Sequence, residues 1–428
     1  MSTPAPALAS DRAVPRPRSR VLLAPLRLPR TGPAEPTRPG PVERADDHEA
    51  RVGPRPRGAL GVLEAMEEHG LRGHGGAYVP TALRWRRALG EHGALTVVAN
   101  GAESEPVSAK DGTLMRQRPH LVLEGLQIAV ETLGAQRAVV WLHGDDHGAH
   151  AALAHALTER PRSPGSGPVI ELVHGPSHYL AGQSSAIARA LQGGPALPTT
   201  RRPATRPGGP RTLVQNVETL ARVALLARGH APVSTAVLTV LLPDGRHVVE
   251  VDRSTPLPAV LAALGRSDAP TPRAVLLGGY GGQWVSWDRF RQHTPDELTL
   301  RADGLGLGAG VLAPLPRGTC GVAETASLVA YLAAMSARQC GPCAFGLPAL
   351  AEHFAALAAG SSSRGPLDRL LADAGTIAGR GACHHPDGAT RLVASAVTTF
   401  GDEIDAHVRG RTCPLSHAPT FPVPGVHT

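Results

Sequence analysis

Apolar and polar positions along the chain follow two different periods, and the change of period marks its organisation. Between residues 95 and 226, short apolar runs typical of buried strands alternate with segments whose apolar residues recur at helical spacing. Strands are expected at 95–99, 138–142 and 169–173, and helices at 119–132, at 149–158, after Gly182, and from Leu213 to Leu226. This alternation predicts an α/β fold class with a Rossmann-like, mostly parallel sheet.

Two regions with other patterns follow. Residues 234–302 contain alternating runs at 236–242, 247–251 and 274–280 with one short helix at 256–264, which suits a β-grasp module of the ubiquitin type. Helical spacing then recurs at 322–335, 347–357, 367–377 and 389–408. We therefore expect an α/β domain at 41–230, a β-grasp domain at 234–302 and a helical domain at 318–410, between a disordered Pro/Arg-rich tail at 1–40 and a tail at 411–428.

Charge and composition narrow the partners. The formal net charge is +7, but the first thirty residues carry six Arg against one Asp, so much of the excess lies in the Pro-rich tail. Aromatic residues make up 3% of the chain, too few for obvious base-stacking platforms, so nucleic-acid binding is not expected. No apolar run approaches the length of a membrane span and no secretory signal opens the chain, which predicts a cytoplasmic protein without direct membrane insertion.

A glycine-rich loop is the first candidate site. Gly73, Gly75 and Gly76 allow the backbone to turn tightly and to approach an anionic ligand, so a phosphorylated cofactor is expected here. A helical segment around Leu63 precedes these glycines, whereas an ordinary dinucleotide-binding loop follows a strand. The sequence therefore argues against an ordinary Rossmann loop.

Rare residue types lie beside this loop. Lys110 is the only lysine of the chain, and Asn100 and Asn216 are its only asparagines. Because most positions have accepted Arg, Asp or Ser instead, these three residues are candidates for function. For Lys110, a structural ion pair with Asp111 or Glu105 is an equally open alternative.

Four segments, taken in order, resemble the NADH-binding flavoprotein subunit of respiratory complex I and its relatives in NAD-linked hydrogenases and formate dehydrogenases. The similarity extends over about residues 54–408 and includes an SLBB-type β-grasp module and an iron–sulfur-binding helical bundle. The four segments are 71–85 (LRGHGGAYVPTALRW), 100–106 (NGAESEP), 179–186 (YLAGQSSA) and 214–220 (VQNVETL).

The resemblance implies bound FMN, a 4Fe-4S cluster and NADH as the substrate. It places the glycine loop under the flavin ring and phosphate, and Arg84 where the family has a cationic Lys. Asn216 and Thr219, near the start of a helix, would bind the phosphate. The full implied cofactor-binding set is Gly73, Gly75, Gly76, Arg84, Asn100, Glu103, Ser104, Glu105, Tyr179, Gly182, Gln215, Asn216 and Thr219.

Three cysteines match the cluster motif. Cys340 and Cys343 form a Cys-x-x-Cys pair, and 39 residues separate Cys343 from Cys383. Ala337 occupies the position of the family's first cysteine, so the fourth ligand stays open between Cys320, Cys413, His384, His385 and solvent. Zinc is the alternative occupant of the three-cysteine site. If the helices that carry them are antiparallel, Cys320 and Cys413 approach each other, either as a thiol pair or as a second metal site.

Other positions depart from the family pattern. The departures are His74, Tyr78, Val79, Ala102, and Gln183 with Ser184 in place of an acidic pair. Because the cofactors supply the chemistry, no catalytic side chain is required. The sequence predicts an NADH-dependent flavoprotein oxidoreductase that passes electrons from NADH through FMN and the cluster to a partner iron–sulfur subunit or ferredoxin. The alternative is a divergent paralogue that keeps the fold, and FMN with it, as an electron relay or assembly subunit.

Overall fold

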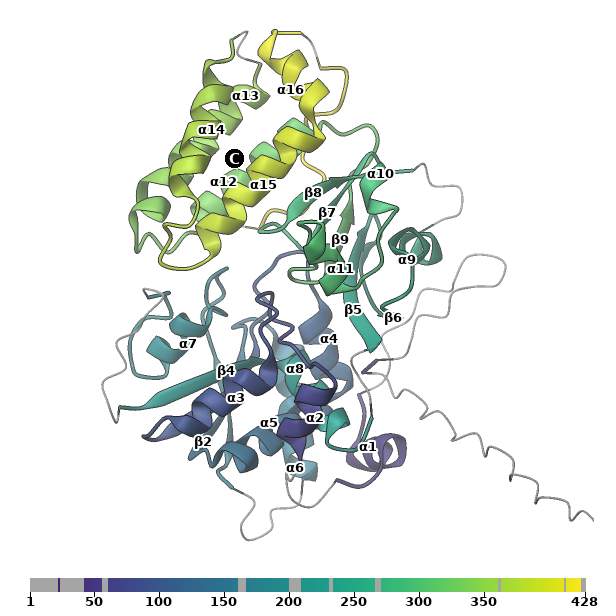
Figure 1. The fold of residues 1–428 in the computed structure, drawn as a ribbon, viewed down its shortest axis with the longest axis vertical. Helices are drawn as coiled ribbons and strands as arrows, with labels where there is room; N and C mark the ends of the chain where they lie inside the picture. The colour runs from purple at the N-terminus through teal and green to yellow at the C-terminus, as the bar shows by residue number, and fades with distance from the viewer. Residues whose placement is uncertain are drawn as a thin grey trace, which may run out of the picture.

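The computed structural model describes residues 22–23, 42–55, 61–160, 167–199, 209–230, 234–265, 271–360, 363–411 and 413–424. The disorder expected for residues 1–40 falls outside this set, apart from Leu22 and Leu23, which are buried. None of the helices within these ranges is long and apolar enough to cross a membrane. The α/β region lies at one end of the molecule and the helical region at the other, with a second sheet beside the junction (Figure 1).

A four-stranded parallel sheet forms the core of the α/β region. Its strand order is β3-β2-β1-β4, from β1 (Leu95–Gly101), β2 (Arg137–Leu142), β3 (Ile170–His174) and β4 (Arg211–Asn216). One face packs in a single core with α5 (Pro119–Leu133) and α8 (Val217–Leu226), and Ile187 of α7 (Ser184–Ala190) packs on the other face. A Cβ at Gly125 would lie 1.9 Å from Leu220 O, so this glycine allows α5 and α8 to touch. The remaining helices of this region are α1 (Ala45–Val52), α2 (Val62–Glu68), α3 (Thr81–Gly90), α4 (Lys110–Gln117) and α6 (His147–Glu159).

Strand β4 corrects the sequence-based prediction, which started a helix at Leu213. Residues Arg211–Asn216 instead pair with β1 in parallel, and α8 begins directly after them. The side chain of Asn216 accepts a hydrogen bond from Glu218 N and so caps α8 without an intervening turn. A strand that runs straight into a helix leaves no turn signal between the two elements.

The second sheet has five strands in the order β6-β5-β9-β7-β8. The strands are β5 (Thr235–Leu242), β6 (Gly245–Asp252), β7 (Ala274–Leu277), β8 (Gln283–Ser286) and β9 (Val311–Pro314). β5 and β9 are parallel neighbours at the centre, and the other pairs are antiparallel. The sheet therefore extends past residue 302, where the sequence suggested a boundary. Helices α9 (Leu257–Leu264), α10 (Trp287–Phe290) and α11 (Glu297–Ala302) accompany it.

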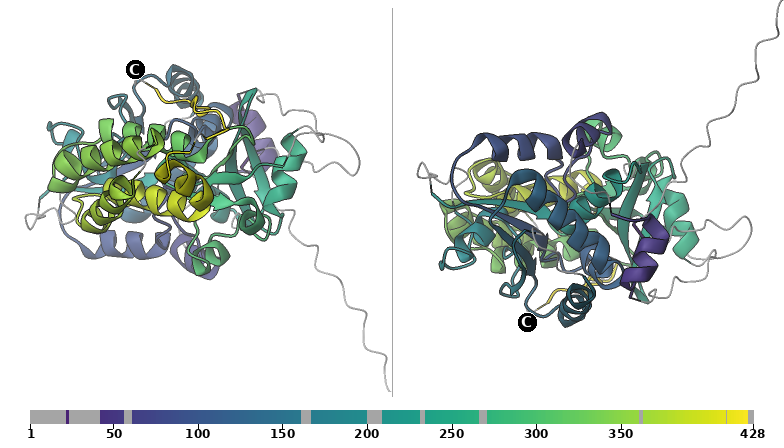
Figure 2. Two further views of the ribbon diagram at one scale, coloured as in Figure 1. Left: turned by 90° about the horizontal axis from the view of Figure 1, so that it is seen from above. Right: turned by 90° about the horizontal axis from the view of Figure 1, so that it is seen from below.

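The helical region is a bundle that overlies the parallel sheet when viewed from its own end of the molecule (Figure 2). It comprises α12 (Gly321–Ala334), a π-helical turn η2 (Pro342–Gly346), α13 (Leu347–Ala358), α14 (Gly365–Ile377), α15 (His385–Thr399) and α16 (Gly401–Val408). The single helix expected at 389–408 is wrong, because the chain breaks at Phe400 between α15 and α16. The Phe400 ring packs against Gly321, where a Cβ would lie 2.4 Å from it.

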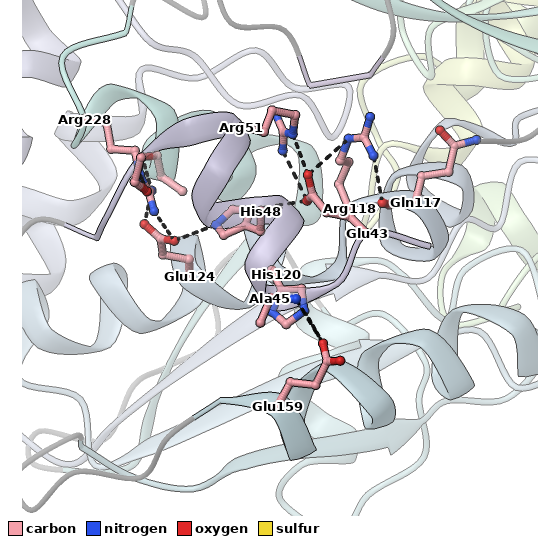
Figure 3. Close-up of polar contacts among 12 residues, drawn as sticks. Glu43, Ala45, His48, Arg51, Gln117, Arg118, His120, Glu124, Glu159 and Arg228 are labelled. Atoms are coloured by element: carbon pink, nitrogen blue, oxygen red, sulfur yellow. Dashed lines mark hydrogen bonds and ion pairs between the residues drawn. The ribbon is translucent and has the colours of Figure 1, made fainter. Parts of the chain in front are cut away.

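A buried ionic network fastens α1 to the α/β core (Figure 3). His48 lies between two carboxylates, with Nε2 3.0 Å from Glu124 and Nδ1 3.3 Å from Glu43. Arg228 also pairs with Glu124, and Arg51 with Glu43. Burial lowers the pKa of His48, but the hydrogen bonds to Glu124 and Glu43 outweigh burial and raise it above its ordinary value.

Candidate functional site

The carboxyl ends of β1 and β4 form the topological switch point of the parallel sheet. After β1 the chain continues towards β2 and β3 on one side, whereas β4 pairs with β1 on the other side. Ligands of open α/β sheets bind in the crevice at such a point. Asn100 and Asn216, the two asparagines of the chain, are direct register partners here.

The two asparagines connect separate segments at this point. Asn100 Nδ2 donates to Gly182 O at 2.8 Å, which brings the 179–186 segment to the end of β1. Asn216 Nδ2 donates to Asp111 Oδ2 at 2.6 Å, while its Oδ1 accepts from Glu218 N at 2.9 Å. Three of the four segments that the sequence singled out therefore meet at this point.

The glycine loop lies against the start of α8. A Cβ at Gly75 would lie 3.5 Å from Asn216 Cβ, and Gly76 has a φ of +92°, in the region that favours glycine. His74 N donates to Thr219 Oγ1 at 2.9 Å. The first and last of the predicted segments are thus in direct contact.

Arg84 provides a cation beside the same strand end. Its Nη2 donates to Val214 O at 2.8 Å, and within the described ranges no carboxylate lies at ion-pair distance from it. Burial lowers the pKa of Arg84 below its ordinary value. A half-buried guanidinium without an acidic partner, next to a helix N-terminus, is suited to an anionic group such as a phosphate.

Lys110 is buried in an ion pair. The structural alternative, a pair with Asp111, is therefore present. Lys110 Nζ lies 2.7 Å from Asp111 Oδ1 and 2.9 Å from Glu218 Oε2, and not beside Glu105. Burial lowers the pKa of Lys110, but these carboxylates outweigh it and raise the pKa. Glu218 also pairs with Arg222. The sequence analysis did not predict a role for Glu218, although its position within the 214–220 segment could have indicated one.

The three polar residues after Ala102 have different surroundings. Glu103 accepts from Asp111 N at 3.2 Å and Gly112 N at 3.0 Å, so its carboxylate holds the start of α4. Ser104 Oγ is buried without a hydrogen-bond partner. Glu105 Oε2 accepts from the Tyr179 hydroxyl at 3.0 Å. Burial raises the pKa of Glu105 to about 7, against the opposing hydrogen bonds from the Tyr280 backbone and Tyr179.

A small cavity of about 40 Å³ lies behind the glycine loop. Gly73, His74, Lys110 and Glu218 line it from the α/β region, and the second sheet closes it on the other side. Both ring nitrogens of His74 and Gln215 Nε2 are buried without hydrogen-bond partners among the described residues. Burial lowers the pKa of His74 to about 3, so this imidazole is neutral.

These features fit an FMN-type ligand. Buried donors and acceptors without partners, at Ser104 and Gln215, match a ligand that carries polar edges. Arg84 supplies the positive charge that a phosphate requires, and the glycine loop leaves the backbone uncovered by side chains.

Two of the departures from the family pattern have defined structural roles. The guanidinium groups of Arg72 and Arg301 each lie 5.3 Å from the centre of the Tyr78 ring. Gln183 Oε1 accepts from Ser185 N and Ala186 N at 2.7 and 3.0 Å and caps α7. The Tyr78 ring is therefore engaged within the protein, and Gln183 has a capping function that its amide oxygen can perform.

The bundle brings together the three cysteines of the predicted cluster site. Cys343 lies in η2, Cys340 precedes that turn, and Cys383 precedes α15. Burial is the main cause that raises the pKa of Cys343 to about 12, and the neighbouring thiols of Cys340 and Cys383 raise it further. Cys343 and Cys383 are buried, and Cys340 is partly exposed. Thiolates at converging helix ends suit an iron–sulfur cluster.

The candidates for a fourth ligand are placed as follows. Cys320 caps the far end of α12 and lies with Cys413, about 20 Å by helix rise from the cysteines at the other end. His385 Nε2 hydrogen-bonds Leu332 O at 2.7 Å, and His384 Nδ1 lies 3.2 Å from Asp387. Cys320 and Cys413 are therefore removed from the cluster site.

Aromatic residues bridge the two sites. Tyr179 hydrogen-bonds Glu105 beside the switch point, and its ring lies 5.3 Å from that of His385. His385 is two residues beyond Cys383. Tyr331 of α12 packs edge-on against Tyr179 at 5.9 Å. Packed rings thus lead from Glu105 to His385, which is two residues from Cys383.

Comparison with known proteins finds matches for both the α/β region and the helical region. Residues 66–225 match the family model of the Nuo51 FMN-binding domain, and residues 323–407 match that of the NADH-ubiquinone oxidoreductase-F iron-sulfur binding region. The chain is 30% identical over 389 residues to the F subunit of the NADH-quinone oxidoreductase of Mycobacterium bovis, covering 83% of this chain and 86% of that protein. The corresponding F subunit of Streptomyces coelicolor is 29% identical over 394 residues, covering 83% and 85% of the two chains.

Two hydrogenases are also similar. The HndC subunit of the NADP-reducing hydrogenase of Solidesulfovibrio fructosivorans is 26% identical over 379 residues, covering 82% of this chain and 77% of that protein. The crystal structure of an NAD+-reducing [NiFe]-hydrogenase in the H2-reduced state shares the fold, with a TM-score of 0.71 and 24% identity; the match covers 86% of this chain and 65% of that one. The resemblance inferred from the sequence is confirmed: the chain belongs to the family of NADH-quinone oxidoreductase F subunits and carries its FMN-binding and 4Fe-4S-binding regions.

Proposed function

We propose that this chain is an NADH-oxidising flavin and iron–sulfur subunit that delivers electrons to a partner protein. The observation that carries the proposal is the connection from Glu105 at the switch point through Tyr179 to His385, which is two residues from Cys383. Electron transfer over short distances needs fixed, closely packed sites, and this connection supplies them. FMN held here would accept the hydride of NADH and release it as one proton and two single electrons.

The residues around the switch point hold the flavin in this proposal. Arg84, with the start of α8 at Asn216 and Thr219, binds the phosphate. The buried hydroxyl of Ser104 and the amide of Gln215 donate to the polar edge of the ligand. The loop Gly73, Gly75 and Gly76, together with Asn100, Glu105, Tyr179 and Gly182, shapes the remaining surface. Glu103 contributes indirectly, because its carboxylate fixes the start of α4.

Cys340, Cys343 and Cys383 attach the cluster, which then has three cysteine ligands. In the part of the chain that the structure describes, one group of three or more Cys, His, Asp or Glu residues has ligand atoms that all lie within 4.8 Å of one another, and it does not include these cysteines. The three thiols are therefore spread more widely than a single zinc ion requires, which favours the cluster over zinc.

The cluster side of the bundle is where we place the electron acceptor. Cys340 is partly exposed, and the neighbouring Phe345 is 79% exposed. An exposed aromatic ring beside a redox centre suits the centre of an interface with an iron–sulfur subunit or ferredoxin. The cytoplasmic location expected from the sequence stays a prediction.

The domain organisation is also part of this proposal. The second sheet has a parallel central pair, antiparallel outer strands and one crossing helix, α9, which supports an SLBB-type β-grasp module. The domains expected at 41–230, 234–302 and 318–410 correspond to the parallel sheet, most of this module and the bundle. Strand β9 adds residues 311–314 to the module.

A second candidate function is supported by the engaged positions Tyr78 and Gln183. A paralogue that binds FMN without oxidising NADH would tolerate both changes. Tyr78 is held by the guanidinium groups of Arg72 and Arg301, and Gln183 caps α7 where the family has an acidic residue. NADH-dependent dye reduction after reconstitution with FMN and iron–sulfur separates the two functions. Turnover supports the enzyme, and bound yellow flavin without turnover supports the relay.

A further inference from the structure

Four potential metal ligands meet at the end of the bundle opposite the cluster cysteines. They are Cys320, His407, Cys413 and His417, and one ligand atom from each lies within 4.8 Å of the other three. Cys320 Sγ and His407 Nε2 are 3.4 Å apart. In a tetrahedral zinc site, neighbouring ligand atoms are about 3.3–3.8 Å apart, as the usual Zn–N and Zn–S lengths require.

The ligands come from three parts of the chain. Cys320 is the N-cap of α12, and His407 lies in the last turn of α16. Cys413 and His417 belong to the segment that follows α16, with three residues between them. After α16 this segment turns back to the start of α12, where Ser416 pairs with Thr319 (Figure 1). The fold therefore brings Cys320 to three ligands that lie about ninety residues further along the chain.

The surroundings orient the first two ligands. Cys320 N donates to Ser416 O at 2.8 Å, which fixes the C-terminal segment at the cap of α12. The His407 ring faces Cys320 with Nε2 and also hydrogen-bonds the backbone of Ala358 and Leu357. Metal-binding histidines commonly donate their other nitrogen to a carbonyl in this way. The nearby carboxylate of Glu403 is already engaged by Arg273 and Gly321 N.

We propose that Cys320, His407, Cys413 and His417 form a structural zinc site that fixes the C-terminal segment to the helical bundle. Two cysteines and two histidines in a closed tetrahedral set are a common ligand combination for structural Zn²⁺. Binding converts both thiols to thiolates and releases their two protons to solvent. The two thiolates then balance the charge of the ion. Since Zn²⁺ does not change its redox state, this site would not carry electrons.

The consequence of the site is a fixed C-terminal segment. Beyond His417, Glu324 of α12 accepts from Thr420 N at 2.8 Å and Phe421 N at 3.0 Å. The Phe421 ring is buried and stacks on Trp284 at 5.9 Å. Zinc bound by Cys413 and His417, together with Cys320 and His407, would attach this segment to the bundle. Without the metal, hydrogen bonds and apolar packing alone hold the segment.

The test is zinc content and stability of the full-length protein and of two variants. His417 is exposed, so His417→Ala removes a ligand without opening the core; His92→Ala, at another exposed histidine, is the control. Wild type and the control are expected to keep one zinc per chain after dialysis against a chelator, measured by plasma mass spectrometry. The His417→Ala variant is expected to lose it and to melt at a lower temperature, with unchanged circular dichroism at room temperature.

A second variant separates this site from the cluster cysteines, where zinc can bind adventitiously. Cys343→Ser is expected to lose iron and sulfide but to keep its zinc. Cobalt substituted into that variant should show the visible ligand-field bands of tetrahedral sulfur and nitrogen coordination, and these should vanish when Cys413→Ser is added. Zinc that disappears with Cys343→Ser and is unaffected by His417→Ala overturns the proposal, as does a Cys320–Cys413 disulfide in protein isolated under reducing conditions.

Discussion

Replacing Lys110 with methionine tests whether this lysine holds together the start of α4 and α8. The substitution keeps the length of the side chain and removes its charge. Asp111 and Glu218, both buried, then lose the ammonium that lies 2.7 and 2.9 Å from them. Arg222 still pairs with Glu218, so the uncompensated charge falls mainly on Asp111 and its neighbour Glu103.

The size of the effect follows from burial. The side chain of Lys110 is 5% exposed and those of Asp111 and Glu218 are 10% and 3% exposed. Removal of one partner from such a buried pair costs about 3–5 kcal/mol. At about 2–4 °C per kcal/mol this corresponds to a melting temperature lowered by about 6–20 °C.

Urea unfolding followed by circular dichroism measures the loss, with Arg86→Met as the matched control. Arg86 pairs with Glu67 at 2.6 Å, but both side chains are about half exposed, so this control should cost less than about 1 kcal/mol. Addition of Asp111→Asn to Lys110→Met should restore part of the stability. A loss for Lys110→Met no larger than for Arg86→Met would refute the ion-pair reasoning.

Three further predictions concern other parts of the molecule. The pKa of His48 is raised in the folded protein, so its protonated form stabilises the fold fully below about pH 6.5 and this contribution is lost as pH rises through the folded pKa. The difference in free energy of unfolding between wild type and His48→Gln, measured by urea titration, should therefore decrease from pH 6 to alkaline pH. Arg84→Ala should weaken FMN binding by tenfold or more, from the loss of about 1.5–3 kcal/mol for a charged hydrogen bond, measured by quenching of flavin fluorescence, whereas an unchanged Kd would remove Arg84 from the phosphate site. Phe345→Ala should slow reduction of a partner protein but not of a small dye, and Leu371→Ala, at an exposed leucine of α14, should change neither.

The segments that form the candidate site could be found from the sequence because they contain glycine clusters and the rarest residue types of the chain. The rarity of Asn100, Asn216 and Lys110 singled out residues that the fold brings to one strand end. Hydrophobic period correctly indicated a mostly parallel first sheet and a helical C-terminal region. The strands of this sheet are buried on both faces and therefore have continuous apolar runs, whereas the helices of the bundle have apolar residues at helical spacing.

What the sequence did not reveal depends on contacts between distant segments. Strand β4 ends in Asn216, whose side chain caps the next helix, so no turn residue separates the two elements. Glu103 has no local sign that its carboxylate serves the backbone of Asp111 and Gly112. The Phe400 ring, at the break between α15 and α16, fills the space over Gly321 at the start of α12, a contact that no local pattern shows.

Anaerobic titration of the purified protein with NADH, followed by visible absorption, tests the central claim most directly. We expect flavin and iron–sulfur bands at the start, and bleaching of both as NADH is added, because the contacts from Glu105 through Tyr179 to His385 lead from the flavin site to within two residues of Cys383. Flavin and cluster bands that persist in excess NADH would contradict NADH oxidation by this chain.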